Sequence, residues 1–178
     1  MQTVPEFAAT ERLKDGSAVT IRVMNPDDKE RLVEAFLKLQ PQTVRMRFLY
    51  AKKHLCEGEL RWLGKIGLGR HFGLVATVPT GNGEVIVAEG SNVATGDAAE
   101  IGFTVADAWQ GRGIASRLLG HLARNARAQG VRRFEADVLR GNAPMLAVFR
   151  HSGLAMTTAE AEGALRVTLA LESAAPRH

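Results

Sequence analysis

Cysteine is almost absent from this sequence of 178 residues, since Cys56 is the only one. A single thiol cannot form an internal disulfide, and Cys56 is not part of the paired-cysteine spacing that zinc sites use. The sequence therefore argues against a disulfide-stapled secreted scaffold and against a metal site, and it fits a reducing compartment. No base is evident beside the thiol, so we expect Cys56 to be inert rather than nucleophilic.

Long apolar runs are also missing: nowhere do about 18 apolar residues follow one another, and the first 15 residues carry three carboxylates. We therefore expect a soluble cytoplasmic protein that has no membrane partner. Aromatic residues make up only 6% of the chain, and none lies among the arginines between residues 117 and 131. A nucleic-acid surface usually combines basic and stacking aromatic side chains, so we expect no nucleic-acid partner.

The residues that are present are those of an ordinary folded domain, with 46% hydrophobic and 24% charged residues. These values exclude a disordered chain, a collagen and a repeat fibre. The length fits one domain over residues 1–178, without a linker or a low-complexity tract.

Periodicity and turn residues predict a mixed α/β layer arrangement, in which helices pack on a sheet. Asn25 and Pro26 begin a helix with the apolar face Leu32, Ala35, Phe36 and Leu39, and Pro41 is expected to stop it. One or two short helices are expected within residues 42–66. The other predicted elements are strands over 18–23, 71–78, 84–88, 99–105, 131–139 and 164–171, a hairpin loop over 79–83, and helices over 113–128 and 143–151, closed by Gly130 and Gly153.

The most informative segment joins the strand over 99–105 to the helix that follows it. Gly111 and Gly113 lie in this turn, where glycine allows a ligand close to the backbone and unpaired helix amides favour a phosphate. A tight strand-to-helix turn is the plain structural alternative. No Gly-Lys-Ser/Thr follows, which excludes a Walker loop, and the third glycine of the dinucleotide fingerprint is missing.

The run Gln110-Gly111-Arg112-Gly113-Ile114-Ala115 resembles motif A of the GNAT acetyltransferases, the Gln/Arg-x-x-Gly-x-Gly/Ala loop. The resemblance implies a GNAT fold of the α+β class, with a mixed, mostly antiparallel sheet of about 6–7 strands flanked by helices. It also implies acetyl-CoA as co-substrate, with the pyrophosphate in the loop and the pantetheine arm along the preceding strand. The cofactor-binding residues implied in this way are Phe103, Thr104, Val105, Gln110, Gly111, Arg112, Gly113, Ile114, Ala115 and Ser116.

A second segment, residues 142–154, is similar to the family's Asn-x-x-Ala-x-x-x-Tyr-x-x-x-Gly-Phe pattern. Asn142 matches the asparagine that contacts the cofactor. The tyrosine that often protonates the leaving thiolate is replaced by Phe149, and the only tyrosine of the chain is Tyr50. Residues 99–115, together with Leu13 to Ser17 and Pro26 to Asp28, resemble Pat-type bacterial protein lysine acetyltransferases, and this likeness covers roughly residues 12–172.

Glu100 is the candidate general base, because it matches the acidic residue that acts as base in the Pat-type domains. Strand alternation places it with Gly102 and Thr104 on one face of the strand. The structural alternative is an exposed glutamate at a strand end. His71 and His151 are rival bases, since imidazole suits proton transfer near pH 7. Trp109 could line the cofactor, although packing of the turn onto the core is the expected role.

The resemblance implies acetyl transfer to a protein lysine, and an acyl-CoA ligase is one possible substrate. Acetylation of a small amine and non-catalytic sensing of acyl-CoA remain as alternatives, and acceptor choice is expected to depend on residues 41–72 and 155–164.

The basic excess of the chain is local. Six arginines and no acidic residue lie between Asp107 and Glu135, and the other 17 basic residues are outnumbered by the 19 acidic ones. This placement favours a small polyanion such as coenzyme A.

Overall fold

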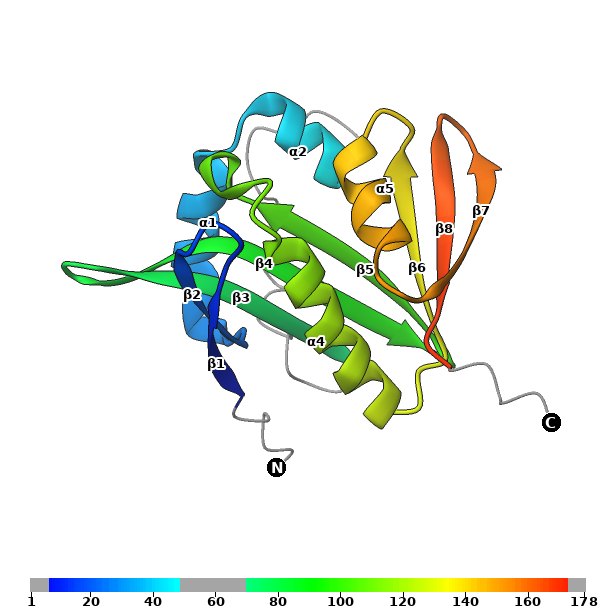
Figure 1. Ribbon diagram of the computed structural model, residues 1–178, viewed down its shortest axis with the longest axis horizontal. Helices are drawn as coiled ribbons and strands as arrows, with labels where there is room; N and C mark the ends of the chain where they lie inside the picture. Colours follow the sequence, from blue (N-terminus) through cyan, green and yellow to red (C-terminus); the bar gives the residue numbers. More distant parts are fainter. Residues whose placement is uncertain (1–6, 49–69, 173–178) are drawn as a thin grey trace.

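A computed structural model describes residues 7–48 and 70–172, and eight strands of these residues form one sheet (Figure 1). The strand order is β1-β2-β3-β4-β5-β6-β8-β7, and every neighbouring pair is antiparallel except β5 and β6, which are parallel. The strands are β1 (Ala8–Arg12), β2 (Ala18–Val23), β3 (His71–Thr80), β4 (Gly83–Thr95), β5 (Ala98–Val105), β6 (Arg133–Leu139), β7 (Ala155–Ala161) and β8 (Ala164–Ala170). The chain is thus an α+β protein with a mostly antiparallel sheet, as the sequence predicts.

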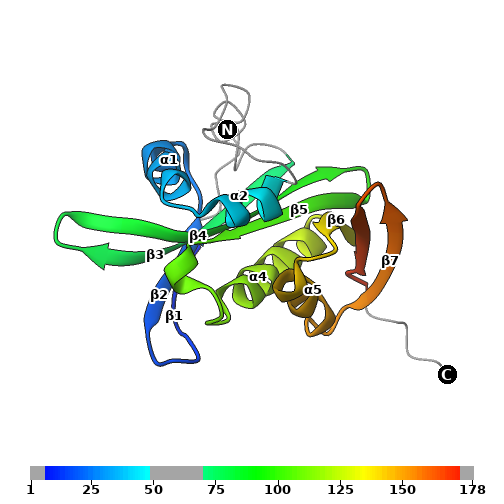
Figure 2. The same cartoon turned by 90° about the horizontal axis from the view of Figure 1, so that it is seen from above.

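Helices cover both faces of this sheet. Figure 2 shows α1 (Lys29–Leu37) and α2 (Pro41–Phe48) on one face, and α4 (Ile114–Ala128) and α5 (Ala143–Arg150) on the other. Two short 3₁₀ turns, η1 (Pro26–Asp28) and η2 (Asp107–Trp109), precede α1 and α4. None of the described helices has the length and apolar character that a bilayer crossing requires.

Most predicted elements are confirmed, and the differences have local causes. The two strands that the sequence prediction lacks, β1 and β7, lie at the two edges of the sheet and expose most of their residues, so they show no apolar alternation. Strands β3 and β4 continue into the predicted loop 79–83 and leave a turn of only two residues, Gly81 and Asn82. Strand β4 also continues past Ala88 to Thr95.

The prediction that Pro41 stops a helix is wrong. Helix α1 already ends at Leu37, and Pro41 is the first residue of α2. The ring of proline fixes φ near its helical value and needs no amide hydrogen there, so the first helical position suits it. The rest of the helical prediction for residues 42–66, together with Tyr50 and Cys56, falls outside the described residues.

The main core lies between the sheet and helix α4. Leu118 and Leu122 of this helix are fully buried, as is Phe134 of β6. The apolar residues of α4 recur at helical spacing and form one stripe, which packs against the strands. Gly130, with φ of 81°, ends the helix as the sequence predicts.

Strands β5 and β6 pair only at their beginnings. Ala98, Ala99 and Glu100 are opposite residues 133–135, and beyond this point no pairing joins the two strands. Parallel strands that separate in this way leave backbone groups unpaired along the opening, in the middle of the sheet. The opening positions the candidate site.

Candidate active site

A cavity of about 1450 Å³ extends along the opening between β5 and β6. Side chains from both faces of the sheet line it: Phe36 and Arg47 lie on the face of α1 and α2, and Met145 and Phe149 come from α5 on the opposite face. The volume exceeds the roughly 300–1,000 Å³ of ordinary small-molecule sites, so the cavity can hold a large, elongated ligand. Glu100 and all the predicted cofactor-binding residues except Arg112 line this cavity.

The glycine loop, residues 110–113, leads from the sheet to helix α4. Gly111 and Gly113 have φ of 76° and 89°, a conformation that other residues rarely adopt. Gly113 is the N-cap of α4, and no side chain caps this end of the helix. The first amides of α4 therefore keep their hydrogen-bonding capacity, and the helix dipole adds a positive potential at the same point. This end of the cavity fits a phosphate group.

Arg112 points away from the cavity. Its guanidinium pairs with Asp15 at 3.0 Å, donates to the carbonyl of Ala108 at 2.9 Å, and lies 4.4 Å from the ring centre of Trp109. Asp15 holds its negative charge, since hydrogen bonds from Ser17 lower its pKa. Trp109 itself is half-buried, packs against the core and also lines the cavity, so both roles considered for it are present.

Backbone groups of β5 alternate in direction. The amide of Ala106 donates to the carbonyl of Val87 at 2.8 Å and continues the register between β4 and β5. The N–H and C=O groups of Phe103 and Val105 consequently face the opening, whereas those of Thr104 face β4. The side chain of Gln110 donates to the Val105 carbonyl at 3.1 Å, so the Val105 group that is left for a ligand is its amide. Phe103 and Val105 thus offer backbone groups to a ligand, and Thr104 offers only its side chain.

Glu100 is the last residue of β5 that pairs with β6, and 62% of its side chain is exposed. Its nearest charged partner is Arg166 of β8, at 3.7 Å. Burial alone would lower the pKa of Arg166, but its hydrogen bonds to Asp137 and Glu135 outweigh this effect and raise it. Arg166 therefore stays cationic, and the carboxylate of Glu100 remains accessible from the cavity.

A second carboxylate, Glu89 of β4, was not among the predicted site residues. The register places it opposite Thr104, so both lie on the face of Glu100. Glu89 accepts hydrogen bonds from the Thr104 hydroxyl at 2.9 Å and from Nε of Arg47 at 3.2 Å, and only 15% of its side chain is exposed. No local sequence pattern predicts a role for Glu89. Its place opposite Thr104 follows from the β4–β5 register, which includes Glu89 because β4 continues beyond Ala88.

The remaining predicted residues have mixed positions. Asn142 lines the cavity, but its side chain accepts the amide of Met145 at 3.3 Å and caps helix α5. Phe149 is buried beside Phe103, with ring centres 6.3 Å apart. Of the two histidines, His151 lines the cavity, and His71 lies at the start of β3 outside it.

The fold, the cavity and the glycine loop are those of an acetyltransferase domain. Residues 30–154 match the model of the acetyltransferase (GNAT) family, and the chain belongs to this family. The glycine loop lies within the matched segment, and its open backbone at the start of α4 suits the phosphates of the co-substrate.

Among curated proteins, the chain is similar to the acetyltransferase Pat of Mycolicibacterium smegmatis, with 33% identity over 147 residues. The match covers 80% of this chain but 43% of Pat, so the chain spans less than half of that relative. Among solved structures, the GNAT domain of S. lividans PAT superimposes with a TM-score of 0.83 at 31% identity, over 92% of this chain and 96% of that domain. A cAMP-binding acyltransferase from Mycobacterium smegmatis gives a TM-score of 0.65 at 27% identity, over 94% of this chain and 48% of that protein.

Proposed function

We propose that the protein transfers an acetyl group from acetyl-CoA to the ε-amino group of a protein lysine, with Glu100 as general base. The observation that carries this proposal is the position of Glu100, where β5 and β6 separate and the cavity is open to solvent. A long side chain from a protein surface can reach a carboxylate in that position. The likeness to Pat and to the GNAT domain of S. lividans PAT supports the same acceptor class.

The reaction requires removal of a proton from the acceptor. A free lysine has a pKa of about 10.4 and is protonated at neutral pH, so a carboxylate that accepts the proton, directly or through one water, makes the nitrogen nucleophilic. Acetyl-CoA supplies the activated thioester carbonyl, and the new C–N bond replaces the C–S bond. Glu89 is less suited to be the base, because Thr104 and Arg47 both donate to its Oε1 and only 15% of its side chain is exposed.

Backbone groups perform the second task, which is to stabilise the charge that develops on the carbonyl oxygen. The amides of Phe103 and Val105 face the opening, where they can donate hydrogen bonds to this oxygen. Loss of one such donor commonly lowers the rate by ~10²–10³. Phe149 carries no hydroxyl, so it cannot protonate the departing sulfur.

The test of the acceptor class uses isotope-labelled acetyl-CoA and a cell lysate, followed by mass spectrometry of proteins and metabolites. Label on lysines of a few proteins, acyl-CoA ligases included, is the expected result. Label only on a small amine would replace the protein acceptor with a metabolite. Binding of acetyl-CoA without transfer to any amine would instead identify an acyl-CoA sensor.

A further inference from the structure

Two basic side chains of the described residues, Lys14 and Arg47, line the cavity, and they differ in their partners. Arg47 pairs with Glu89 at 3.2 Å. Within the described part of the chain, no carboxylate lies within ion-pair distance of the Lys14 ammonium. The cavity therefore receives one uncompensated positive charge from Lys14.

Lys14 lies beside the glycine loop, although about 100 positions separate them in the sequence. Its aliphatic stem crosses Gly113, and a Cβ atom on Gly113 would lie 3.3 Å from Cε of Lys14. A side chain at position 113 would thus crowd the stem, and the glycine lets Lys14 reach over the start of α4. Lys14 and the uncapped start of α4 therefore line the same part of the cavity.

Several polar contacts hold the β1–β2 hairpin, which carries Lys14, in this position. The Asp15 carboxylate accepts the amide of Ser17 at 3.0 Å and its hydroxyl at 2.5 Å, which fixes the turn at the tip. Asp15 also pairs with Arg112 of the glycine loop at 3.0 Å. Beside this turn, at the end of β1, Arg117 of α4 donates to the carbonyl of Arg12 at 2.7 Å.

The same contacts pair the charges of Arg112 and Arg117, the two arginines beside the glycine loop. Arg112 is shared between Asp15 and the ring of Trp109, and Arg117 lies 3.6 Å from Glu11. Carboxylates therefore neutralise both arginines, whereas the charge of Lys14 remains available. A cation at this end of the cavity favours a ligand with several phosphate charges, and within the described residues Lys14 is the unpaired cation that lines it.

We propose that Lys14 binds a phosphate group of coenzyme A and determines the preference of the site for the phosphorylated cofactor. Coenzyme A carries two phosphate groups of this kind that Lys14 could contact, the pyrophosphate and the 3′-phosphate of the ribose. The inference rests on acetyl-CoA as co-substrate, and it does not depend on the acceptor or on the role of Glu100.

The test measures the binding of three thiols by calorimetry: coenzyme A, 3′-dephospho-coenzyme A and pantetheine, which has neither phosphate. Lys14→Met is expected to weaken coenzyme A binding about tenfold, because a charge-assisted hydrogen bond is lost. A loss that disappears with dephospho-coenzyme A assigns the 3′-phosphate, and a loss seen with both nucleotides but not with pantetheine assigns the pyrophosphate. Either result supports the proposal.

Three controls accompany this measurement. Lys29→Met removes the same charge at an exposed position outside the cavity and is expected to leave all three affinities unchanged. Lys14→Arg is expected to restore most of the affinity. Since screening weakens exposed charge pairs, added salt should also reduce coenzyme A binding less in Lys14→Met than in the wild type.

The proposal is overturned if Lys14→Met binds coenzyme A as tightly as the wild type, if pantetheine loses as much affinity as coenzyme A, or if the wild type binds no coenzyme A. Unfolding temperatures of all variants show whether a loss reflects misfolding instead. Failure of the proposed lysine acetylation appears separately, as normal coenzyme A binding without transfer to protein lysines.

Discussion

Glu89 and Glu100 lie on the same face of the sheet, yet their surroundings suit them to different tasks. Two hydrogen-bond donors engage Glu89, and 15% of its side chain is exposed. Glu100 is 62% exposed, and its ion-pair partner among the described residues, Arg166 at 3.7 Å, is shared with Glu135 and Asp137. A base must reach both the acceptor and bulk water to pass on its proton, so exposure favours Glu100.

Glu100→Gln is expected to lower kcat at neutral pH by about 10²–10⁴, because the amide cannot accept the proton. Activity should recover in part toward pH 9, where more of the acceptor amine is already neutral. The affinity for acetyl-CoA should stay within about twofold of the wild type, measured by calorimetry beside steady-state kinetics. Glu34→Gln, an exposed glutamate of α1 outside the cavity lining, is the matched control. Unaltered turnover in Glu100→Gln would remove Glu100 from the mechanism.

Gly113 and Gly120 provide a matched pair for the glycine loop. Gly113→Ala places a side chain at φ of 89°, which costs about 1–2 kcal/mol, and its Cβ lies 3.3 Å from the Lys14 stem. We expect weaker coenzyme A binding and a lower free energy of unfolding. Gly120→Ala meets no atom within 4 Å inside α4, so it should stabilise the protein by roughly 0.5–1 kcal/mol with unchanged binding. Urea denaturation and calorimetry measure both; equal effects of the two substitutions would contradict the role of Gly113.

At the scale of elements, Asp107 joins the α1–α2 junction to the segment before α4. Its carboxylate accepts the amide of Gln40 at 2.9 Å and the hydroxyl of Thr43 at 2.6 Å. Near the end of α2, the guanidinium of Arg47 packs directly over Gly102 of β5. A Cβ atom added at Gly102 would lie only 2.8 Å from Cζ of Arg47. Helix α2 therefore lies over β5 because polar contacts hold it, with Val44 as its buried apolar residue.

Asp107→Ala is expected to release the start of α2 from the cofactor side of the site. The loss of two hydrogen bonds should cost about 1–3 kcal/mol of local stability. Hydrogen exchange should become faster in residues 40–48 and stay unchanged in β6 and β8. Asp97→Ala removes an exposed carboxylate that pairs with Arg133 and is the control. Exchange that accelerates equally throughout the sheet would show a global rather than a local effect.

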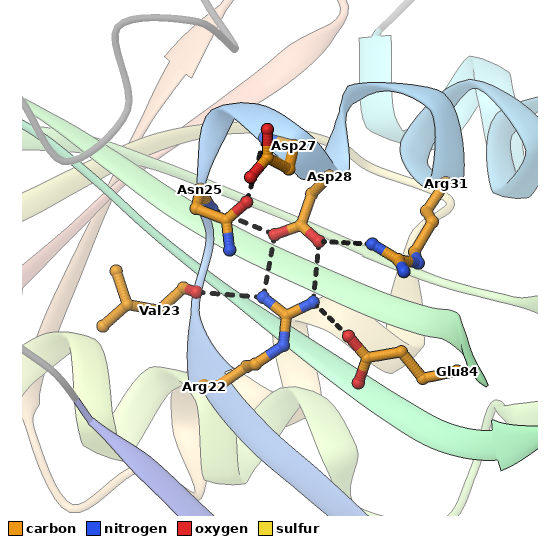
Figure 3. A network of polar contacts seen from close by, with 7 residues as sticks. All are labelled: Arg22, Val23, Asn25, Asp27, Asp28, Arg31 and Glu84. Atoms are coloured by element: carbon orange, nitrogen blue, oxygen red, sulfur yellow. Dashed lines mark hydrogen bonds and ion pairs between the residues drawn. The ribbon is translucent and has the colours of Figure 1, made fainter.

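At the scale of the whole molecule, a buried ion network connects the sheet to the layer of α1 (Figure 3). The guanidinium of Arg22 lies 2.6 Å from Asp28 and 2.5 Å from Glu84, and the Asp28 side chain is fully buried. Arg31 of α1 lies 3.6 Å from the same carboxylate, and the amide of Asn25 donates to it at 2.9 Å. Burial alone would raise the pKa of Asp28, but its hydrogen bonds outweigh this effect and lower it.

Asp28→Asn is expected to reduce the free energy of unfolding by about 3 kcal/mol, because it leaves the charge of Arg22 partly uncompensated in a buried position. Chemical denaturation at pH 7 measures the loss. Asp27→Asn changes the exposed neighbour in the same turn and should cost less than about 0.5 kcal/mol. A similar loss in both variants would show that the turn, and not the buried charge, determines stability.

The same network predicts acid sensitivity. The pKa values of Asp28 and of Glu84, which accepts a hydrogen bond from Arg22, are lowered in the folded protein. Their unfolded values are about 3.9 and 4.3, so the unfolded state binds more protons as the pH falls. Their contribution should be complete above about pH 5 and disappear as the pH falls through the folded pKa values. Unfolding temperatures at pH 7, 5 and 3.5 test this, and Asp28→Asn should show a weaker decline.

Features that depend on neighbouring residues could be predicted from the amino-acid sequence alone. Gly130 and Gly153 end helices, Asn25 and Pro26 begin one, and the glycine loop joins β5 to α4, because turn chemistry and helical periodicity act over a few residues. The predicted alternation of β5 is also confirmed, with Ile101 and Phe103 buried on the face opposite to Glu100. The edge strands β1 and β7 were missed, since exposed strands carry no apolar pattern.

Which distant residues meet at the site depends on the packing of the folded chain. The separation of β5 from β6 after Glu100, the place of Glu89 opposite Thr104, and the approach of Lys14 to Gly113 all depend on register and packing between remote segments. The same packing turned Arg112 toward Asp15 and away from the cavity. A residue's local sequence fixes its backbone preference, but the partner of a charged side chain depends on which other charges the fold brings within a few ångströms.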